Sequence, residues 1–599
     1  MDFRLARKLV SDLIKNNRLV YRPSQAAAIL MTALLYIIFA ISDMLRGSSF
    51  LGARSIAQLI QVLAFVFVGI SVFIFFYINS FLAKRRQATY GLYAVLGLDK
   101  KDLEKLYTLD SLYFFIKSAV LGLLIGMLAS RLAYTLISNL LKGSVVFPFK
   151  LSVIALLAVV IVLLALFLLL LAFNFASIRK NEIVDLLVAE GRGEKEPKAS
   201  LMLSILSVAI LAFAYHIANH FDDAFGALNN FLLAVPLVVL GSYLLFMALS
   251  VFVLKALKKN KAFYYQTRHF FNISNLIFRM KANAGSLATI SVLFTCAFLT
   301  FSVTATLYFG SAATVDAMAP RAMNFEQHLT ITVDEDKPSL KALVLGQPTL
   351  QQLPQLNQKM AGKKGLEVSR ELTRVSWLSD PNDSSSWVEI DDTVPAKAAS
   401  SYELSYLYAF DLNLSPEEQD DYCIDLYDLQ KSSRLRQDSK QDGVNVSYQW
   451  LSYNSRADME EATRLTFGTL FFIGIYFIIF FLITSSLILY FKQLNQAYGD
   501  CEAFYTLQEL GLDRKGVKAM INTQVLITFF LPLAFAIINV LASYKILWAL
   551  LEALTQKSYN QSYFGKMSLI SVLILGGFYF LVYLWTTKIY YQIVERKVS

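Results

Sequence analysis

Ten long apolar stretches constrain the fold of this chain more than any other feature. An α-helix needs roughly 20 apolar residues to cross a bilayer. Stretches of that length or more cover residues 24–45, 56–82, 110–137, 151–175, 200–219, 230–254, 285–309, 466–490, 520–546 and 567–588. The first is long, follows a charged segment and lacks a clear small-x-small cleavage site, so we expect a span there and not a signal peptide. The sequence therefore predicts an α-helical polytopic membrane protein.

Charge divides the chain into two unlike parts. Residues 311–460 hold 24 Asp and Glu against 14 Lys and Arg, whereas the remainder holds 21 acidic and 41 basic residues. The cations cluster beside apolar stretches, where orientation in a membrane explains them better than nucleic acid binding does. No nucleic acid partner is expected. The three scattered cysteines (Cys296, Cys423 and Cys501) predict packing residues and no disulfide framework.

The basic loops predict the orientation. Residues 84–105 follow the second span, and residues 255–281 carry seven Lys and Arg with no acid. Alternating spans place both loops, both termini and the loop 491–519 on one side, and excess positive charge marks that side as the cytoplasm. The acidic block 310–465 then lies outside the cell, between the seventh and eighth spans.

The acidic block reads as a mixed α/β domain. Strands are expected at Gln327–Val333, Leu366–Leu378, Trp387–Ile390 and Val444–Tyr453. Ser415-Pro416-Glu417-Glu418 combines an N-cap, a proline at the first helical position and the glutamate of a capping box. A helix from there to about Gln430 follows.

These observations give an expected domain organisation. Its segments are a cytoplasmic interfacial helix (1–23), spans one to four (24–175), a cytoplasmic linker (176–199), spans five and six (200–254), a cytoplasmic interfacial segment (255–284), span seven (285–309), the extracellular domain (310–465) and spans eight to ten (466–599).

Catalytic signatures are missing from the sequence. It has no phosphate-binding Gly-x-x-x-x-Gly-Lys-Ser/Thr, no Gly-x-Ser-x-Gly and no His-Glu-x-x-His. We expect no enzyme activity, no metal and no cofactor in this chain. His216 and His220, followed by Asp222 and Asp223, could be read as a metal site, but a solvated helix end is the favoured interpretation. Ionisable residues are nearly missing from mid-membrane positions, which argues against an ion-coupled carrier.

Two glycine patterns remain. Gly122 and Gly126 in the third span have the spacing of closely packed helices, for which we expect a partner within the chain. Leu96-Gly97-Leu98-Asp99 recurs as Leu510-Gly511-Leu512-Asp513, with an offset of 414 residues. Each copy follows a span on the cytoplasmic side, so spans two to four match spans eight to ten, as in transporters built from repeats. Coincidence is the alternative for so short a match.

The first copy of this repeat resembles a known family. Lys84-Arg85-Arg86 followed by Tyr90-Gly91-Leu92-Tyr93-Ala94-Val95-Leu96-Gly97 resembles the signature of FtsX-like permeases, although Thr89 replaces the usual glutamate. The second half is similar to the BceB (bacitracin-export-type) subgroup at Tyr490-Phe491-Lys492-Gln493, Tyr498-Gly499-Asp500 and Leu507–Gly511. Asn495-Gln496-Ala497 departs from the more acidic segment that is usual there.

The resemblance implies ten transmembrane helices in two FtsX-like halves, with a mixed α/β extracellular domain between helices 7 and 8. It implies a bacterial cell-membrane permease that works with two copies of a cytoplasmic ABC ATPase, which would bind ATP and Mg. The system would release peptide antibiotics from lipid-linked cell-wall precursors, and a sensor histidine kinase would be a further partner. Residues expected to couple to the ATPase are Arg85, Arg86, Thr89, Tyr90, Gly91, Leu96, Gly97, Tyr498, Asp500, Leu510 and Gly511.

Other functions remain open at this point. One is another FtsX-type role, such as control of wall hydrolases or export of lipid or lipoprotein. Another is a sensor that binds peptide and signals without conferring resistance. An ion-coupled carrier is the weakest alternative.

Overall fold

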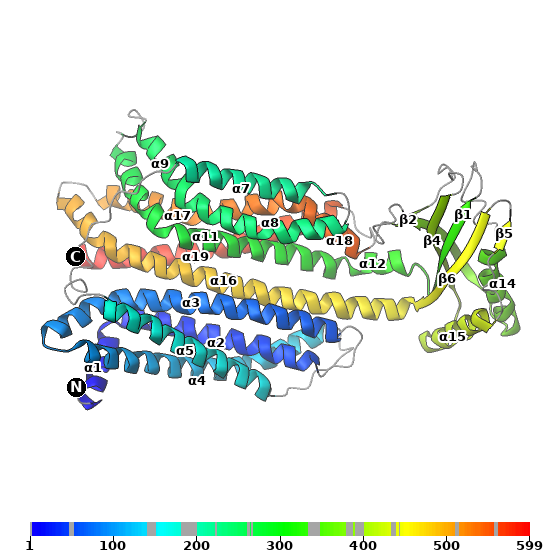
Figure 1. The fold of residues 1–599 in the computed structure, drawn as a ribbon, viewed down its shortest axis with the longest axis horizontal. Coiled ribbons are helices and arrows are strands. Elements are labelled where there is room, and N and C mark those ends of the chain that lie inside the picture. Colours follow the sequence, from blue (N-terminus) through cyan, green and yellow to red (C-terminus); the bar gives the residue numbers. More distant parts are fainter. Residues whose placement is uncertain are drawn as a thin grey trace.

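The fold is a long helical bundle with a sheet domain at one end (Figure 1). It is taken from a computed structural model. The described residues are 3–46, 53–140, 151–180, 201–221, 224–259, 264, 267–333, 348–378, 387–389, 400–432, 439–441, 444–509, 514–555 and 561–598.

Helices of the bundle account for most of the described chain. The first part holds α1 (Phe3–Asn16), α2 (Arg18–Arg46), α3 (Ala53–Val95), α4 (Lys100–Leu140) and α5 (Val153–Lys180). The middle holds α7 (Leu201–Asn219), α8 (Ala224–Leu244), the π-helical turn η1 (Leu245–Leu249), α9 (Ser250–Lys259), α11 (Thr267–Phe309) and α12 (Ser311–Met318). The last part holds α16 (Arg456–Glu509), α17 (Arg514–Ala542), α18 (Tyr544–Leu554) and α19 (Gln561–Val598).

Membrane-spanning character follows from length and apolarity. Within the described residues, nine helices are long and apolar enough to cross a membrane. They coincide with nine of the ten predicted spans. The remaining one, predicted at 56–82, falls in α3, where Phe67–Ala83 is a shorter apolar helical segment. The predicted class of polytopic helical membrane protein is confirmed.

Two groups of four helices within the bundle use the same packing pattern. In the first group α2 packs against α3, α4 and α5; in the second, α11 packs against α16, α17 and α19. The helices α7 and α8 pack on each other, and α8 and η1 contact α11. The repeat noted in the sequence thus corresponds to two groups with matching helix partners.

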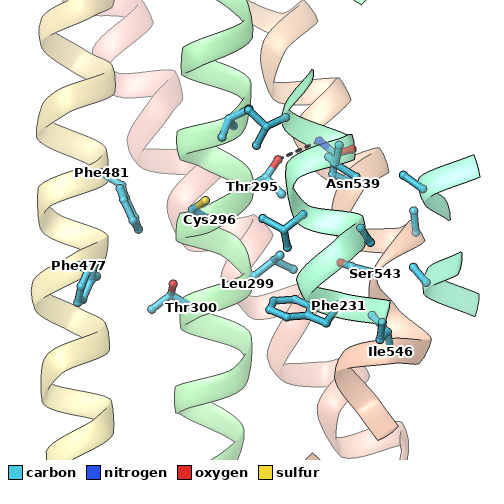
Figure 2. Close-up of a pocket in the computed structure, with 18 of the residues that line it drawn as sticks. Phe231, Thr295, Cys296, Leu299, Thr300, Phe477, Phe481, Asn539, Ser543 and Ile546 are labelled. Carbon is cyan, nitrogen blue, oxygen red and sulfur yellow. Dashed lines mark hydrogen bonds between the residues drawn. The ribbon is translucent and has the colours of Figure 1, made fainter. Parts of the chain in front are cut away.

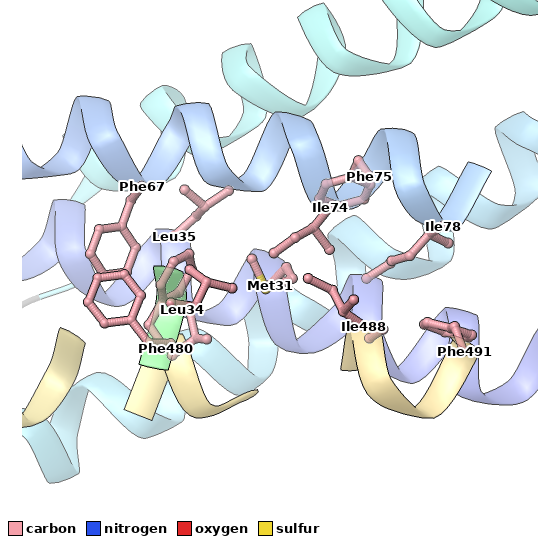
Figure 3. Packing of buried hydrophobic residues seen from close by; sticks show 14 of the residues in the cluster. Met31, Leu34, Leu35, Phe67, Ile74, Phe75, Ile78, Phe480, Ile488 and Phe491 are labelled. Carbon is pink, nitrogen blue, oxygen red and sulfur yellow. The ribbon is translucent and has the colours of Figure 1, made fainter. Parts of the chain in front are cut away.

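Aromatic side chains join the two groups. The rings of Phe67 on α3 and Phe480 on α16 have centroids 3.9 Å apart, and Phe81 and Phe491 follow on the same two helices at 4.9 Å. Figure 3 shows these helices meeting α2 through Met31 and other buried side chains. The two groups therefore share one continuous apolar core.

The glycine pair of the third span packs inside the chain, as expected. A Cβ atom added at Gly122 would lie 2.5 Å from Cβ of Thr32 and 2.8 Å from the carbonyl oxygen of Ile29. One added at Gly126 would lie 3.0 Å from Cβ of Tyr36. Glycine is needed here because α4 approaches α2 too closely for a side chain between them.

The sheet domain, residues 323–455, contains six antiparallel strands in the order β3-β2-β4-β1-β6-β5. These are β1 (Met323–Val333), β2 (Ser369–Leu378), β3 (Trp387–Glu389), β4 (Ser400–Asp411), β5 (Ser439–Gln441) and β6 (Val444–Ser455). One sheet face, including Phe325 and Ile331, packs with side chains of α14 (Pro348–Lys363) and α15 (Pro416–Ser432), such as Leu353 and Leu426.

The four predicted strands and the predicted helix are present. The capping box at the start of α15 is formed, because the backbone N–H of Ser415 donates to the carboxylate of Glu418 at 3.0 Å. Two larger elements, α14 and the central strand β4, were not predicted.

The eighth span belongs to a longer helix than expected. The helix α16 begins directly after β6. It includes residues 456–465, which the sequence analysis assigned to the extracellular domain.

Candidate coupling site

The turn between α3 and α4, residues 96–99, lies at the end of the bundle opposite the sheet domain (Figure 1). The helix α3 ends there in a Schellman motif. The N–H of Leu98 donates to the carbonyl of Tyr93 at 3.1 Å, and the N–H of Gly97 donates to that of Ala94 at 3.1 Å. Gly97 has φ of 99°, a left-handed conformation that glycine adopts without strain. The repeated glycine therefore marks a sharp helix end.

An apolar stripe is exposed at this turn. Leu92, Val95 and Leu96 are 55%, 66% and 75% exposed. Their spacing of three and four residues places them on one face of the last turn of α3 and its cap. We call these three residues the elbow stripe. Leu96 is among the predicted coupling residues; Leu92 and Val95 were not predicted, although the helical spacing places them beside it.

Arg86 lies inside the bundle, two to three turns before the elbow stripe. Its Nη2 atom is 2.8 Å from Oδ2 of Asp110 on α4, and its Nε donates to the hydroxyl of Tyr21 on α2 at 2.7 Å. The Tyr21 hydroxyl in turn donates to Asp110 at 2.7 Å. The guanidinium also lies over the rings of Tyr21 and Tyr107. One cation thus joins α2, α3 and α4.

The group formed by Arg86, Asp110 and Tyr21 is shielded from solvent. Only 3% of the Arg86 side chain and none of the Asp110 side chain is exposed. Removing a single partner from a buried pair leaves a charge without compensation, at a cost of about 3–5 kcal/mol. Arg86 therefore holds the helices before the elbow together, and its side chain does not form part of the exposed surface.

The other predicted residues are distributed between interior and surface. Tyr90 and Gly91 are buried and Thr89 is half-buried. The side chain of Arg85 is not among those described. Tyr498 and Asp500 belong to α16, but their side chains are likewise not described. Leu510 and Gly511 lie outside the described residues.

Sequence reasoning missed the partners of Arg86. Asp110 and Tyr21 lie on helices that are brought to α3 only by the fold. One signal was available: Asp110 is a lone acid at the first residue of the predicted third span, and an ionisable residue there requires a partner.

A cavity of about 430 Å³ lies elsewhere in the bundle, between α7, α8, α11, α16, α17 and α18 (Figure 2). Its lining is mostly apolar and includes Phe231, Leu299 and Phe477. At one side Nδ2 of Asn539 donates to Oγ1 of Thr295 at 3.2 Å. The described part of the chain places no charged side chain against this cavity.

His216 lies in the last turn of α7, and His220 directly follows this helix. The His216 and His220 rings stack at 4.0 Å, and Nδ1 of His220 is 2.9 Å from the carbonyl oxygen of His216. No group of three or more metal-binding side chains occurs among the described residues. Asp222 and Asp223 lie outside them.

Comparisons with known proteins agree with this architecture. Residues 61–183, which include α4, the elbow stripe and Arg86, match the FtsX-like permease C-terminal family. The bacitracin export permease protein BceB of Bacillus subtilis is 22% identical over 541 residues, covering 80% of this chain and 83% of that protein. The ABC transporter permease protein YxdM of the same organism is 28% identical over 240 residues, covering 40% of this chain and 38% of that protein.

The family match and the similarity along most of the chain together define the class: an ABC transporter permease with an FtsX-like permease domain over residues 61–183. A second bacitracin export permease BceB, from Halalkalibacterium halodurans, is 22% identical over 309 residues, covering 49% of this chain and 47% of that protein. Within the family the chain is of the BceB type.

Proposed function

We propose that this permease couples ATP hydrolysis by a separate cytoplasmic ATPase to the release of peptide antibiotics from lipid-linked cell-wall precursors. Similarity to bacitracin export permeases over most of the chain supports this substrate class. In this proposal both termini and the turn between α3 and α4 face the cytoplasm, residues 310–465 face outward, and two ATPase copies supply the sites for ATP and Mg.

The observation that carries the proposal is the continuity of α16. This helix runs for 54 residues without interruption, a length of about 80 Å, and begins at the residue after β6. A push at its far end therefore reaches the sheet domain through a single rod. The elbow stripe provides an apolar docking surface at the same end of the bundle.

Charge supports a cationic ligand for the outward domain. Residues 311–460 carry 24 acidic against 14 basic residues, so their field attracts cationic peptides from a distance. Signalling to a histidine kinase is part of the proposal. A sensor without resistance activity is distinguished by measuring resistance in a strain that lacks the kinase.

The test is a bulky residue at the end of α3. A Cβ atom at Gly97 meets nothing within 4 Å, so this chain leaves room for a side chain there, and we expect the indole of Gly97→Trp to obstruct a docked partner. We expect resistance to fall to that of a deletion strain, while the complex still assembles in the membrane and hydrolyses ATP.

Gly365 provides a matched control. It ends α14 with φ of 69° and equally open surroundings, so Gly365→Trp imposes similar backbone strain far from the ATPase. This variant should keep its resistance. Normal resistance in a Gly97→Trp, Gly511→Trp double variant would contradict the proposed coupling.

A further inference from the structure

Two chain segments connect the sheet domain to the bundle. One is residues 319–322, between α12 and β1; the other is the bond from Ser455 to Arg456, where β6 becomes α16 (Figure 1). The second connection has no loop. Any change in the angle between the sheet domain and α16 must therefore occur within these few residues.

Arg456, at the start of α16, contacts the other connection, residues 319–322. Its backbone N–H donates to the carbonyl of Ala322 at 2.9 Å. Its Nη1 donates to the carbonyl of Ala319 at 3.1 Å, and its Nη2 pairs with the carboxylate of Asp316 on α12. The Nε–H donates to Glu460 one turn along α16 at 3.1 Å. One residue thus contacts both ends of the first connection and the helix that precedes it.

Further hydrogen bonds remove slack from the first connection. The N–H of Ala322 donates to Asp411 at the end of β4 at 2.8 Å. Asn324 accepts from the N–H of Arg321 at 3.1 Å and donates to its carbonyl at 2.7 Å. Residues 321 and 322 are hydrogen-bonded to the sheet. The contacts of Arg456 with this connection therefore also restrain the sheet.

The junction of β6 and α16 is fixed as well. The hydroxyl of Ser455 accepts a hydrogen bond from the N–H of Asp458 at 3.1 Å, as an N-cap does for the first turn of a helix. The α16 helix is therefore fully formed up to the sheet. A movement of α16 is transmitted to the sheet because the first turn of the helix is capped and does not fray.

The exposure of the group decides between a stabilising and an orienting role. The side chains of Arg456 and Asp316 are 33% and 63% exposed. Ion pairs this open to solvent contribute little to folding stability. The planar guanidinium, in contrast, has a fixed set of donors, and here they point at a carbonyl and two carboxylates on different segments. The arrangement restricts geometry more than it stabilises the fold.

We propose that Arg456 is a positioning residue that locks the angle between α16 and the sheet domain, so that α12 and α16 move this domain as one unit. The inference rests on the proposed function for its consequence, the transmission of ATPase movement. The angle itself can be measured without any substrate or nucleotide.

The experiment measures distance distributions by pulsed electron paramagnetic resonance. Spin labels are placed at Asp421 on α15 and Ile479 on α16, two exposed positions, in the full-length permease with its ATPase. We expect a narrow distribution in the parent protein and a broadened one in Arg456→Ala. Arg456→Lys keeps the charge but loses the fork of donors, so it should give an intermediate width and provides the test if the alanine variant fails to fold.

Lys364→Ala is the matched control. It removes another exposed ion pair of the sheet domain, in which Lys364 and Asp425 lie 2.8 Å apart, but one remote from the junction. This variant should keep the narrow distribution. An unchanged width in both folded Arg456 variants would overturn the inference, whatever the protein transports.

The failure of this inference is separable from the failure of the proposed function. A broadened distribution in Arg456→Ala together with normal resistance in the Gly97 and Gly511 double variant would support the angle lock and reject the proposed coupling. If the angle lock and the proposed coupling are both correct, a strain with Arg456→Ala should lose resistance while the complex retains ATPase activity.

Discussion

The guanidinium of Arg86 and the carboxylate of Asp110 lie 2.8 Å apart inside the bundle, almost fully shielded from solvent. Tyr21 closes the group with hydrogen bonds to both. Three helices of the first group, α2, α3 and α4, meet at this point. The turn from α3 to α4 is therefore supported by a polar connection that apolar packing alone would not orient.

Replacing one member of the Arg86–Asp110 pair should lower the free energy of unfolding more than replacing both. Arg86→Gln or Asp110→Asn leaves one buried charge uncompensated, and we expect each to lower the free energy of unfolding by about 3–5 kcal/mol. The Arg86→Met, Asp110→Leu double variant buries no charge and should be less destabilised than either single variant. Thermal unfolding of the purified permease in detergent provides the measurement. Additive losses in the double variant would contradict a coupled pair.

Close packing of α4 on α2 gives a second prediction. Gly122→Ala places a methyl group 2.5 Å from Cβ of Thr32 and 2.8 Å from a backbone oxygen, so the helices must separate. We expect a loss of about 1–3 kcal/mol, which is typical of overpacking. Gly69→Ala on α3 is the control, because a Cβ atom there meets nothing within 4 Å. The measurement compares the unfolding midpoints of the two variants. Equal midpoints would show that α2 and α4 can separate without a loss of stability.

Local signals explain what the sequence predicted correctly. Apolar length located the spans, and the Ser415 to Glu418 capping box located α15, because each signal is contained in a few adjacent residues. The strand β4 had an equally local signal that was overlooked. Residues 404–410 are apolar or aromatic except for Ser405, as is typical of a buried strand, and Leu404, Tyr406, Tyr408 and Phe410 are buried.

The helix α14 was harder to predict. It contains Pro354, and a proline inside a helix removes a backbone hydrogen bond and argues against helical structure. Packing of Leu353 and Met360 in the sheet-domain core accompanies the helix despite this cost. Tertiary contacts of this kind are invisible in the local sequence.

The candidate coupling site also combines features with a local sequence signal and features that depend on tertiary contacts. The turn at Gly97 was identified from its repeat, whereas the burial of Arg86 was not. Reading Lys84, Arg85 and Arg86 as one basic cluster concealed that Arg86 lies on the interior face of α3. Its partner Tyr21 is 65 residues away, so only the packing of three helices reveals the contact.

Glu326 in β1 gives a pH-dependent prediction for the sheet domain. Its carboxylate accepts a hydrogen bond from the hydroxyl of Ser405 on β4 and lies 3.4 Å from Nε2 of His328. Burial opposes ionisation, but these two partners outweigh burial and lower the pKa of Glu326 below its ordinary value of 4.5. The ionised carboxylate is thus the form that the fold favours.

A lowered folded-state pKa means that Glu326 stabilises the domain above the unfolded pKa, near pH 4.5, and that this contribution is lost as the pH falls through the folded value. Denaturant titrations of the full-length permease, followed by tryptophan fluorescence, should therefore show a falling midpoint as the pH drops below about 4.5. Glu326→Gln should have a lower midpoint at pH 7 and a shallower fall in acid. Glu403→Gln, which removes an exposed carboxylate from β4, serves as the control and should follow the parent protein. A Glu326→Gln variant with the parent's pH dependence would show that the strand pair gains nothing from this charge.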